Sequence, residues 1–272
     1  MENKTVYYAG YLQLEKIRVK QNSIKKISIL LIGVLTSAII LSSCGGSGKK
    51  ERAAETEVER IAGKGEIKLG DQIWMGKNLD VVKFRNGDSI PEAKTNEEWL
   101  KAYEQSKPAW CYYDNDPKNG LKYGKLYNWY AVTDPRKLAP EGWEIPSQFS
   151  WQSLERFCDT SYGTNIDVEN LEKTRFGTVE LMDRKDWDTA YCKGENKSGF
   201  RGLPAGYRDS TGSFLYYDNY TGWWSTTEVI NRSFSSANNK SNDAYVFLVN
   251  SIGKDYHNAA SRACGFSVRC VR

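Results

Sequence analysis

Gly265-Phe-Ser-Val-Arg-Cys-Val271, the run that closes the chain, alternates apolar with small or polar side chains. Successive side chains of a β-strand point to opposite faces, so Phe266, Val268 and Cys270 are expected on one face of a strand. Two further runs upstream have the composition of strands, 222–227 and 244–250. The C-terminal part of the chain is therefore predicted to consist mainly of β-strands.

Two segments upstream carry the signals of helices. Thr95-Asn-Glu-Glu98 has the spacing of a capping box just before Trp99, which predicts a helix over residues 96–105. Pro146-Ser147 offers the start of a second helix. Apolar residues then recur at helical spacing, namely Trp151, Leu154, Phe157 and Cys158.

Short strands and tight turns are predicted elsewhere in the chain. Residues 66–69 and 72–75 flank Gly70-Asp71, a dipeptide typical of a hairpin turn. Further turns are expected at Asn86-Gly87 and Asn119-Gly120. Together with the helices, these elements place the chain in the α+β class, with strands in the majority.

An apolar leader precedes the domain. Residues 27–41, ISILLIGVLTSAIIL, carry no charge and follow a pair of lysines. A run of this length is short for a membrane span and has the flanks of a secretory signal. It leads into Leu41-Ser-Ser-Cys44, which resembles the lipobox of bacterial lipoproteins, whose cysteine thiol accepts a diacylglycerol. Residues 1–43 are therefore predicted to be a lipoprotein signal peptide and Cys44 the lipidated residue, with a transmembrane anchor as the alternative.

The segment after Cys44 contains no aromatic side chain and is rich in small and charged residues, so it cannot bury enough surface to order itself. Residues 44–64 are predicted to be a flexible tether that holds the rest of the chain on the order of 25 Å from the lipid. Residues 65–272 are long enough for one domain with a substantial core. The expected location is the outer membrane, at the cell surface or in the periplasm, with the membrane bound through the lipid anchor.

The charge distribution argues against nucleic acid as a partner. The formal net charge is +4, and residues 1–43 hold six Lys or Arg against two Asp or Glu. Subtracting these from the totals of 38 and 34 leaves 32 residues of each sign, so the exported part has no bulk field that attracts a polyanion. All nine tryptophans and 14 of the 17 tyrosines follow residue 43, a composition suited to an aromatic recognition surface.

Seven blocks resemble, in order, the motifs of the Fibrobacter succinogenes major paralogous (FISUMP) domain. The blocks are Gln72-Ile-Trp-Met-Gly-Lys-Asn-Leu79, Trp110-Cys-Tyr-Tyr-Asp-Asn-Asp116, Tyr123-Gly-Lys-Leu-Tyr-Asn-Trp-Tyr-Ala131, Pro140-Glu-Gly-Trp-Glu-Ile-Pro-Ser147, Gly199-Phe-Arg-Gly-Leu-Pro-Ala-Gly-Tyr-Arg208, Trp224-Ser-Thr-Thr227 and Phe266-Ser-Val-Arg-Cys-Val271. The resemblance covers essentially all of residues 65–272. Such domains are common on lipoproteins and secreted proteins of Bacteroidetes-type bacteria, which implies the same setting here.

Two of these regions, residues 145–154 and 265–270, also resemble the formylglycine-generating-enzyme branch of the C-type-lectin-like fold. The resemblance implies a single compact C-type-lectin-like domain with twisted antiparallel strands, few helices and long loops. Formylglycine-generating enzymes oxidise a substrate cysteine with copper held by two cysteines, which invites comparison with Cys264 and Cys270. Because Cys270 stands in a closing block of structural character and no second motif cysteine matches the catalytic pair, we expect no catalysis.

Five cysteines remain after Cys44, and an exported domain favours disulfides. The number is odd, so at least one thiol is free or pairs between chains. Cys111 and Cys270 both lie in family-like blocks on candidate strands, and that resemblance favours a bridge between them. Cys264 with Cys270 is the alternative, although an extended strand would hold these two too far apart to bond.

The loop Asp114-Asn-Asp-Pro-Lys-Asn-Gly120 places oxygen-bearing side chains before a glycine, which is how short loops wrap a hard cation. Asp114, Asp116 and Asn119 are therefore candidate calcium ligands. The EF-hand pattern is incomplete, because Lys125 stands where its twelfth-position glutamate would be. A metal-free turn held by Asx hydrogen bonds is the alternative, and no other cofactor is expected.

The pair Trp223-Trp224 is the candidate ligand-binding site. Adjacent side chains of a strand point to opposite faces, so one indole is expected in the core and the other in solvent. An exposed indole can stack on a sugar ring, and Glu228 and Arg208 are the candidates for bonding sugar hydroxyls. Burial of both indoles is the alternative.

The function expected from these observations is a non-enzymatic, lipid-anchored module of the cell envelope that binds a glycan or, as a second choice, a surface protein. Two alternatives stay open. One is an oxidoreductase of the formylglycine-generating type, and the other is a structural subunit of a surface appendage.

Overall fold

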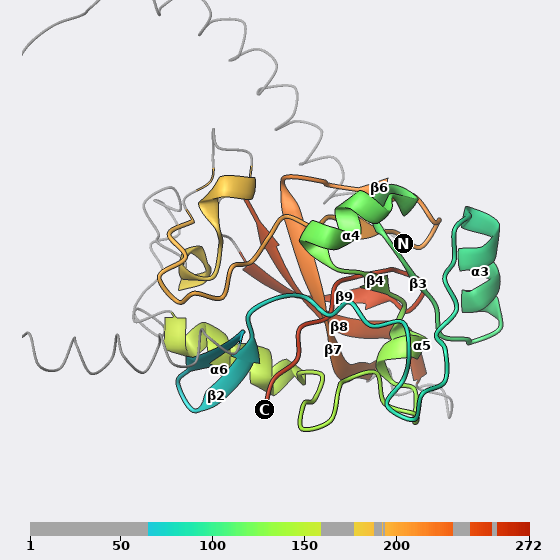
Figure 1. The fold of residues 1–272 in the computed structure, drawn as a ribbon, viewed down its shortest axis with the longest axis horizontal. Helices are drawn as coiled ribbons and strands as arrows, with labels where there is room; N and C mark the ends of the chain where they lie inside the picture. The colour runs from blue at the N-terminus through green and yellow to red at the C-terminus, as the bar shows by residue number, and fades with distance from the viewer. Residues whose placement is uncertain (1–64, 159–176, 188–191, 193, 231–239, 252–254) are drawn as a thin grey trace, which may run out of the picture. The chain divides into compact units, whose positions relative to one another are not determined.

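The computed structural model describes residues 65–158, 177–187, 192, 194–230, 240–251 and 255–272 (Figure 1). These residues form short helices and small antiparallel sheets, which confirms the α+β class. The elements in chain order are β1 (Glu66–Leu69), β2 (Gln72–Met75), α3 (Asn96–Glu104), β3 (Trp110–Cys111), the 3-10 helix η1 (Tyr113–Asn115), α4 (Pro117–Tyr123), β4 (Leu126–Tyr127), α5 (Trp129–Val132), α6 (Gln148–Cys158), the 3-10 helices η3 (Gly177–Glu180) and η4 (Arg184–Asp186), β5 (Tyr207–Arg208), β6 (Phe214–Leu215), β7 (Tyr220–Ile230), β8 (Lys240–Asn250) and β9 (Asp255–Ser261).

The largest sheet is formed by β7, β8 and β9, which pair in chain order and antiparallel (Figure 1). The strands predicted at 222–227 and 244–250 form the central part of β7 and the C-terminal part of β8. Gly222 allows the sheet to pack closely, because a Cβ there would lie 2.6 Å from Leu248 Cδ2 and 2.6 Å from Phe266 Cδ1. At this position of β7, only a residue without a side chain lets Leu248 and Phe266 approach so closely.

The closing segment is extended, but it does not join one sheet as a regular strand. It forms successive bridges to segments far apart in the sequence, pairing Gly265 with Arg208, Phe266 with Tyr127, Ser267 with Trp223, and Val271 with both Trp74 and Glu144. The predicted apolar face is buried as expected, and the opposite face is buried too, including Ser267 and Arg269. The segment is thus surrounded on both faces and connects the small sheets to one another.

The two predicted helices form as α3 and α6. In α3 the capping box is complete, since the Thr95 hydroxyl accepts from Glu98 N and the Glu98 carboxylate accepts from Thr95 N, both at 3.2 Å. In α6 the side chains of Trp151 and Leu154 are buried, whereas Phe157 is exposed. No helix within the described ranges has the length and apolar character needed to cross a membrane.

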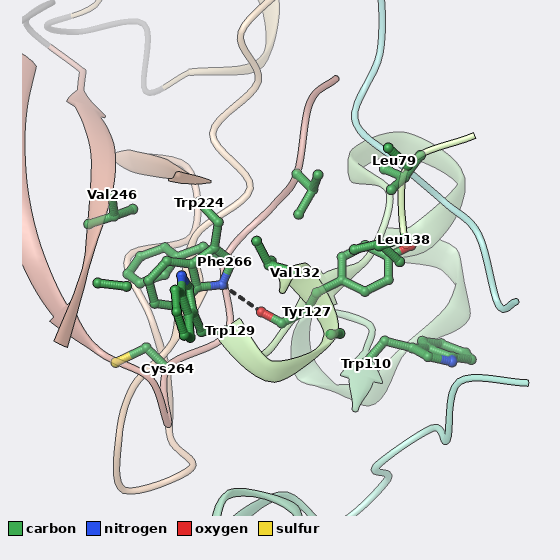
Figure 2. Close-up of a cluster of buried hydrophobic side chains, with 14 of the residues drawn as sticks. Leu79, Trp110, Tyr127, Trp129, Val132, Leu138, Trp224, Val246, Cys264 and Phe266 are labelled. Atoms are coloured by element: carbon green, nitrogen blue, oxygen red, sulfur yellow. Dashed lines mark hydrogen bonds between the residues drawn. The ribbon is translucent and has the colours of Figure 1, made fainter. Parts of the chain in front are cut away.

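The core consists of clusters rich in tryptophan. One of them gathers Tyr127, Trp129, Trp224 and Phe266, and within it the Trp224 indole donates to Tyr127 O at 2.7 Å (Figure 2). A second cluster is built around Trp151, whose ring stacks on Phe247 with 4.9 Å between centroids. All nine tryptophans lie in the described residues, and Trp143 alone among them is not buried. Tryptophan therefore builds the interior of this domain.

Candidate binding surface

The predicted Trp223-Trp224 site is buried on both sides of β7. Trp223 is 1% and Trp224 0% exposed. The alternation of the strand does send them to opposite faces, but each face is covered by a core cluster, so the expectation of one exposed indole is wrong. The Trp223 indole donates to Asn78 Oδ1 at 2.8 Å, which satisfies its N–H inside the core.

Arg208, the predicted partner of sugar hydroxyls, is also buried and serves the fold. Its guanidinium lies 4.8 Å from the ring centroids of both Trp99 and Phe214. It donates to the Gly212 carbonyl at 2.9 Å, and it bonds further acceptors at Ala93, Thr95 and Asn96. The arginine therefore joins α3 to the β5–β6 hairpin and has no access to a ligand.

Glu228, the last residue of the predicted ligand site, is exposed near the end of β7. Its Oε2 lies 3.3 Å from Arg262 Nη2. The neighbouring predicted residues are all buried, so the structure does not bring Glu228 together with them into one site.

The predicted bridge between Cys111 and Cys270 is not formed, because both residues are free, buried thiols. Cys111 packs in a cluster with Trp99 and Tyr113, whereas Cys270 belongs to the cluster of Trp224. Different neighbours thus surround the two residues. The alternative partner, Cys264, is free as well. Burial raises the pKa of the thiols of Cys111, Cys264 and Cys270 to about 12, so all three are protonated at neutral pH.

The predicted calcium loop forms the start of α4. The Asp116 carboxylate caps this helix by accepting from Lys118 N at 2.9 Å, and Asn119 Nδ2 donates to Tyr113 O at 2.9 Å. Asp114 has a positive φ of 52°. These bonds are those of the metal-free turn that the sequence left open. Among the described residues, no group of three His, Cys, Asp or Glu side chains could hold a metal ion, and calcium at this loop stays a prediction.

A group of tyrosines that the sequence did not single out includes two exposed rings. We call it the tyrosine surface, and its members are the exposed Tyr216 and Tyr217, the partly buried Tyr207 and Tyr220, and the buried Tyr123. Tyr216 and Tyr217 are 37% and 42% exposed. The Tyr216 ring stacks on Tyr207 at 5.8 Å and contacts Tyr220 at 5.7 Å. Tyr217 meets Tyr123 edge-on at 5.6 Å. The dense tyrosines of residues 216–220 are the sequence signal that could have identified it.

The loop that carries the two exposed tyrosines has an unusual backbone. Tyr216 has a φ of 60° and Asp218 a φ of 68°. A bulky residue in this left-handed region costs on the order of 1–3 kcal/mol and persists only where its surroundings hold it. Here Tyr220 N donates to Tyr216 O at 3.2 Å, and Ser251 N donates to Asn219 O at 2.9 Å. The loop is therefore tied to β8 while its rings stay in solvent.

The base of the tyrosine surface is closely packed. Tyr207 stacks on Phe266 at 4.9 Å, which connects the surface to the core. Gly206, with a φ of 60°, lies under it, because a Cβ at this position would be 2.5 Å from Tyr113 Cε2 and 2.7 Å from Leu215 O. Only glycine satisfies both the backbone conformation and the space. The exposed rings thus stand on a rigid support.

A hollow of about 790 Å³ lies beside the partly buried Trp143. The guanidinium of Arg272 is 4.9 Å from the Trp143 ring, and Arg85 Nη2 donates to the carbonyls of Ala139, Pro140 and Trp143. These bonds engage Arg85 in stabilising the loop of residues 139–143. Trp143 is the aromatic side chain that lines the hollow, whereas several aromatic rings meet at the tyrosine surface.

A protein-family model described as the Fibrobacter succinogenes major domain matches residues 67–272. The chain belongs to this family. The match confirms the resemblance seen in the sequence blocks, and it spans both the core and the tyrosine surface. No curated protein and no solved structure shows a significant match to the chain.

In this Fibrobacter succinogenes major domain, the sequence blocks mainly supply the interior. Trp74, Trp110, Tyr127, Trp224 and Phe266 all come from them and are buried. Residues 209–223 fall between two blocks and carry both exposed tyrosines. The family motifs therefore identify the scaffold, and the exposed rings had to be located from the structure.

Proposed function

We propose that the protein is a non-enzymatic, lipid-anchored module of the cell envelope that binds a glycan through the tyrosine surface. The observation that carries the proposal is the exposure of Tyr216 and Tyr217 on a loop held in the left-handed backbone region. Aromatic rings stack well on the apolar face of a sugar, and they lose little conformational entropy on binding. A loop that keeps two rings in solvent at an energetic cost suits a recognition surface.

Polar groups beside the rings support a glycan as the ligand. The phenol oxygens of Tyr123 and Tyr217 lie 3.3 Å apart, and each hydroxyl can donate and accept. Asp218 and Asn219 follow in the same loop, where Asn219 Nδ2 donates to Asp218 Oδ1 at 2.5 Å. A sugar presents both an apolar face and hydroxyl groups, so this mixture favours a glycan over a surface protein, the second choice.

We further propose that the domain has a C-type-lectin-like fold. The short antiparallel strands and the few helices of the described residues support this, as do the long connections between them. A fold alone does not define a function, so the ligand proposal depends on the tyrosine surface.

Attachment to the outer membrane is proposed to occur through Cys44, after removal of residues 1–43. The supporting observation is the sequence alone, because the leader, Cys44 and the tether lie outside the described residues. Metabolic labelling of producing cells with an alkyne fatty acid tests the proposal. The wild-type chain is expected to take up the label and Cys44→Ser to lack it, and equal labelling of both would contradict lipidation.

The cysteine chemistry of the domain argues against the oxidoreductase alternative. A reactive cysteine needs its thiolate, and burial raises the pKa of the Cys264 and Cys270 thiols to about 12. No specific observation favours the third option, a subunit of a surface appendage. We therefore propose binding without catalysis.

A glycan array probed with the full chain in detergent tests the ligand proposal. The wild-type protein is expected to bind a defined set of glycans, and the double variant Tyr216→Ala/Tyr217→Ala to bind them about tenfold or more weakly, because two ring contacts are lost. Phe149→Ala removes an exposed ring from α6, away from the tyrosine surface, and serves as the matched control. Glycan binding that is absent, or equal in wild type and double variant, would refute the proposal.

A further inference from the structure

A cavity of about 370 Å³ lies beside the C-terminal end of α4, and we call it the α4 cavity. Its size is at the lower end of small-molecule sites. The charged residues that line it come from five separate parts of the chain. They are Lys77, Asp80, Lys122, Asp186, Arg201 and Arg269. Four cations against two acids give the lining a net positive charge.

Both acids of the lining are already paired with lysines. Lys122 Nζ lies 2.6 Å from Asp186 Oδ1. Asp80 forms an ion pair with Lys125, a buried lysine that does not line the cavity. Neither carboxylate is therefore left to neutralise the remaining cations of the cavity.

Arg201 is also partly satisfied, because its Nε lies 3.2 Å from Asp183 Oδ2 at the protein surface. Lys77 is exposed and has no ion-pair partner among the described residues. Arg269 likewise has no carboxylate partner among them. The cavity thus combines one exposed and one buried cation that lack a counter-charge.

Arg269 is the unusual member of the lining, because it is only 1% exposed. Its Nε and Nη2 donate to Asn78 Oδ1 at 3.1 and 2.7 Å, and Nη1 donates to the Phe200 carbonyl. The same Asn78 oxygen also accepts from the Trp223 indole, so three donors share an atom with two lone pairs. Burial, reinforced by the nearby Arg201, lowers the pKa of Arg269 to about 9.

A buried cation bonded only to neutral oxygens is costly, and an anion bound beside it reduces that cost. All three nitrogens of Arg269 already donate within the protein, so its charge would act on a bound anion through space, and the direct contacts would come from the exposed Lys77 and Arg201. We propose that the α4 cavity binds the carboxylate of an acidic sugar, with Arg269 as the buried cation and Lys77 and Arg201 as the exposed ones.

The position of the cavity links it to the tyrosine surface. Lys122 lines the cavity, and the next residue, Tyr123, contacts Tyr217. One glycan could therefore place a sugar ring on the tyrosines and an acidic unit in the cavity. Naming a glycan as the source of the carboxylate rests on the proposed function, whereas the recognition of a carboxylate does not.

The acids of the lining favour a sugar acid over a free phosphate. The carboxylates of Asp80 and Asp186 line the same cavity and can accept hydrogen bonds. A sugar acid such as glucuronate carries hydroxyl groups that can donate to them as well as a carboxylate for the cations.

Isothermal titration of the full chain in detergent with sodium glucuronate, glucose, acetate and inorganic phosphate tests the proposal. Glucuronate is expected to bind most tightly and glucose most weakly. Lys77→Gln and Arg201→Gln are each expected to weaken glucuronate binding by about fivefold, the effect of one charge pair near the surface. Lys118→Gln removes an exposed lysine of α4 outside the cavity and is the matched control. Because both test positions are exposed, the fold does not depend on them.

The outcomes separate the cavity from the tyrosine surface. If the double variant Tyr216→Ala/Tyr217→Ala still binds glucuronate more tightly than glucose, the carboxylate site in the cavity is supported even where the glycan proposal fails. If acetate binds as tightly as glucuronate, the cavity recognises a carboxylate, but the assignment of that carboxylate to a sugar is wrong. Equal binding of glucose and glucuronate, tighter binding of phosphate, or no effect of either cavity variant would overturn the proposal.

Discussion

Trp223 and Trp224 are neighbours in β7, yet their indole N–H groups donate to acceptors in separate parts of the core. Trp223 bonds Asn78 Oδ1 at 2.8 Å, and Trp224 bonds Tyr127 O at 2.7 Å. The same strand is thereby fixed from both faces. The pair stabilises the scaffold on which the exposed tyrosines stand.

Replacing either tryptophan should therefore affect stability and leave ligand affinity unchanged. Trp223→Phe and Trp224→Phe each remove a buried hydrogen bond and ring volume, and each is expected to lower the free energy of unfolding by about 1–3 kcal/mol. Urea denaturation followed by circular dichroism measures the change. Trp143→Phe, at the partly exposed tryptophan, is the control and is expected to change stability by about 0.5 kcal/mol or less. A large loss of glycan affinity in the folded Trp224→Phe protein would contradict this assignment.

Local features of the fold could be predicted from the sequence. The capping box at Thr95 and Glu98 involves residues three apart, so the start of α3 was evident without tertiary information. The turn at Gly70-Asp71 joins two adjacent strands and could be predicted in the same way. Both features involve residues that are close in the sequence, so their spacing can be read from the sequence directly.

Features that depend on distant segments were missed. Alternation correctly separated Trp223 from Trp224, but the covering of both faces of β7 depends on residues more than 70 positions away. Arg208 was misassigned for the same reason, since its acceptors at Ala93 and Thr95 belong to a remote helix start. Exposure of Tyr216 and Tyr217 follows from a left-handed backbone that composition does not reveal.

The C-terminal end of α3 offers a stabilising substitution. Ser106 has a φ of 52° and follows the cap residue Gln105, with Ser106 N donating to Tyr103 O and Lys107 N to Ala102 O. This is the Schellman arrangement, in which glycine is preferred. Ser106→Gly is expected to raise the free energy of unfolding by about 0.5–1 kcal/mol.

Thermal or urea unfolding of Ser106→Gly measures this gain. The control is Ser89→Gly, because Ser89 is exposed and its φ is not positive. There, added backbone freedom should lower stability slightly. A Ser106→Gly protein less stable than wild type would show that this end of α3 is not strained.

The buried cysteines should resist alkylation in the folded protein. Cys111, Cys264 and Cys270 are free, and burial raises the pKa of each thiol to about 12, so little thiolate exists at pH 8. Iodoacetamide followed by peptide mass spectrometry is expected to leave all three unmodified until denaturant is added. Recovery of a disulfide-linked Cys111–Cys270 peptide without reduction would contradict the free thiols described above.

Acid should weaken one surface ion pair. Hydrogen bonds from Arg136 lower the pKa of the Asp134 carboxyl below its ordinary value of 3.8. An acid whose pKa is lower in the folded state stabilises that state above its unfolded pKa, and it loses this contribution as the pH falls through the folded value. Unfolding free energies measured from pH 6 to pH 2 should therefore fall less steeply below about pH 4 in Asp134→Asn than in wild type. Parallel curves for the two proteins would refute this linkage.

The bridges made by the closing segment have a consequence for biogenesis. A ribosome releases Gly265 to Val271 after every segment that they join, from Trp74 to Trp223. Until then the small sheets lack the residues that connect them, so the nascent polypeptide cannot form these bridges. The domain is therefore expected to reach its final packing only after its last residues have been synthesised.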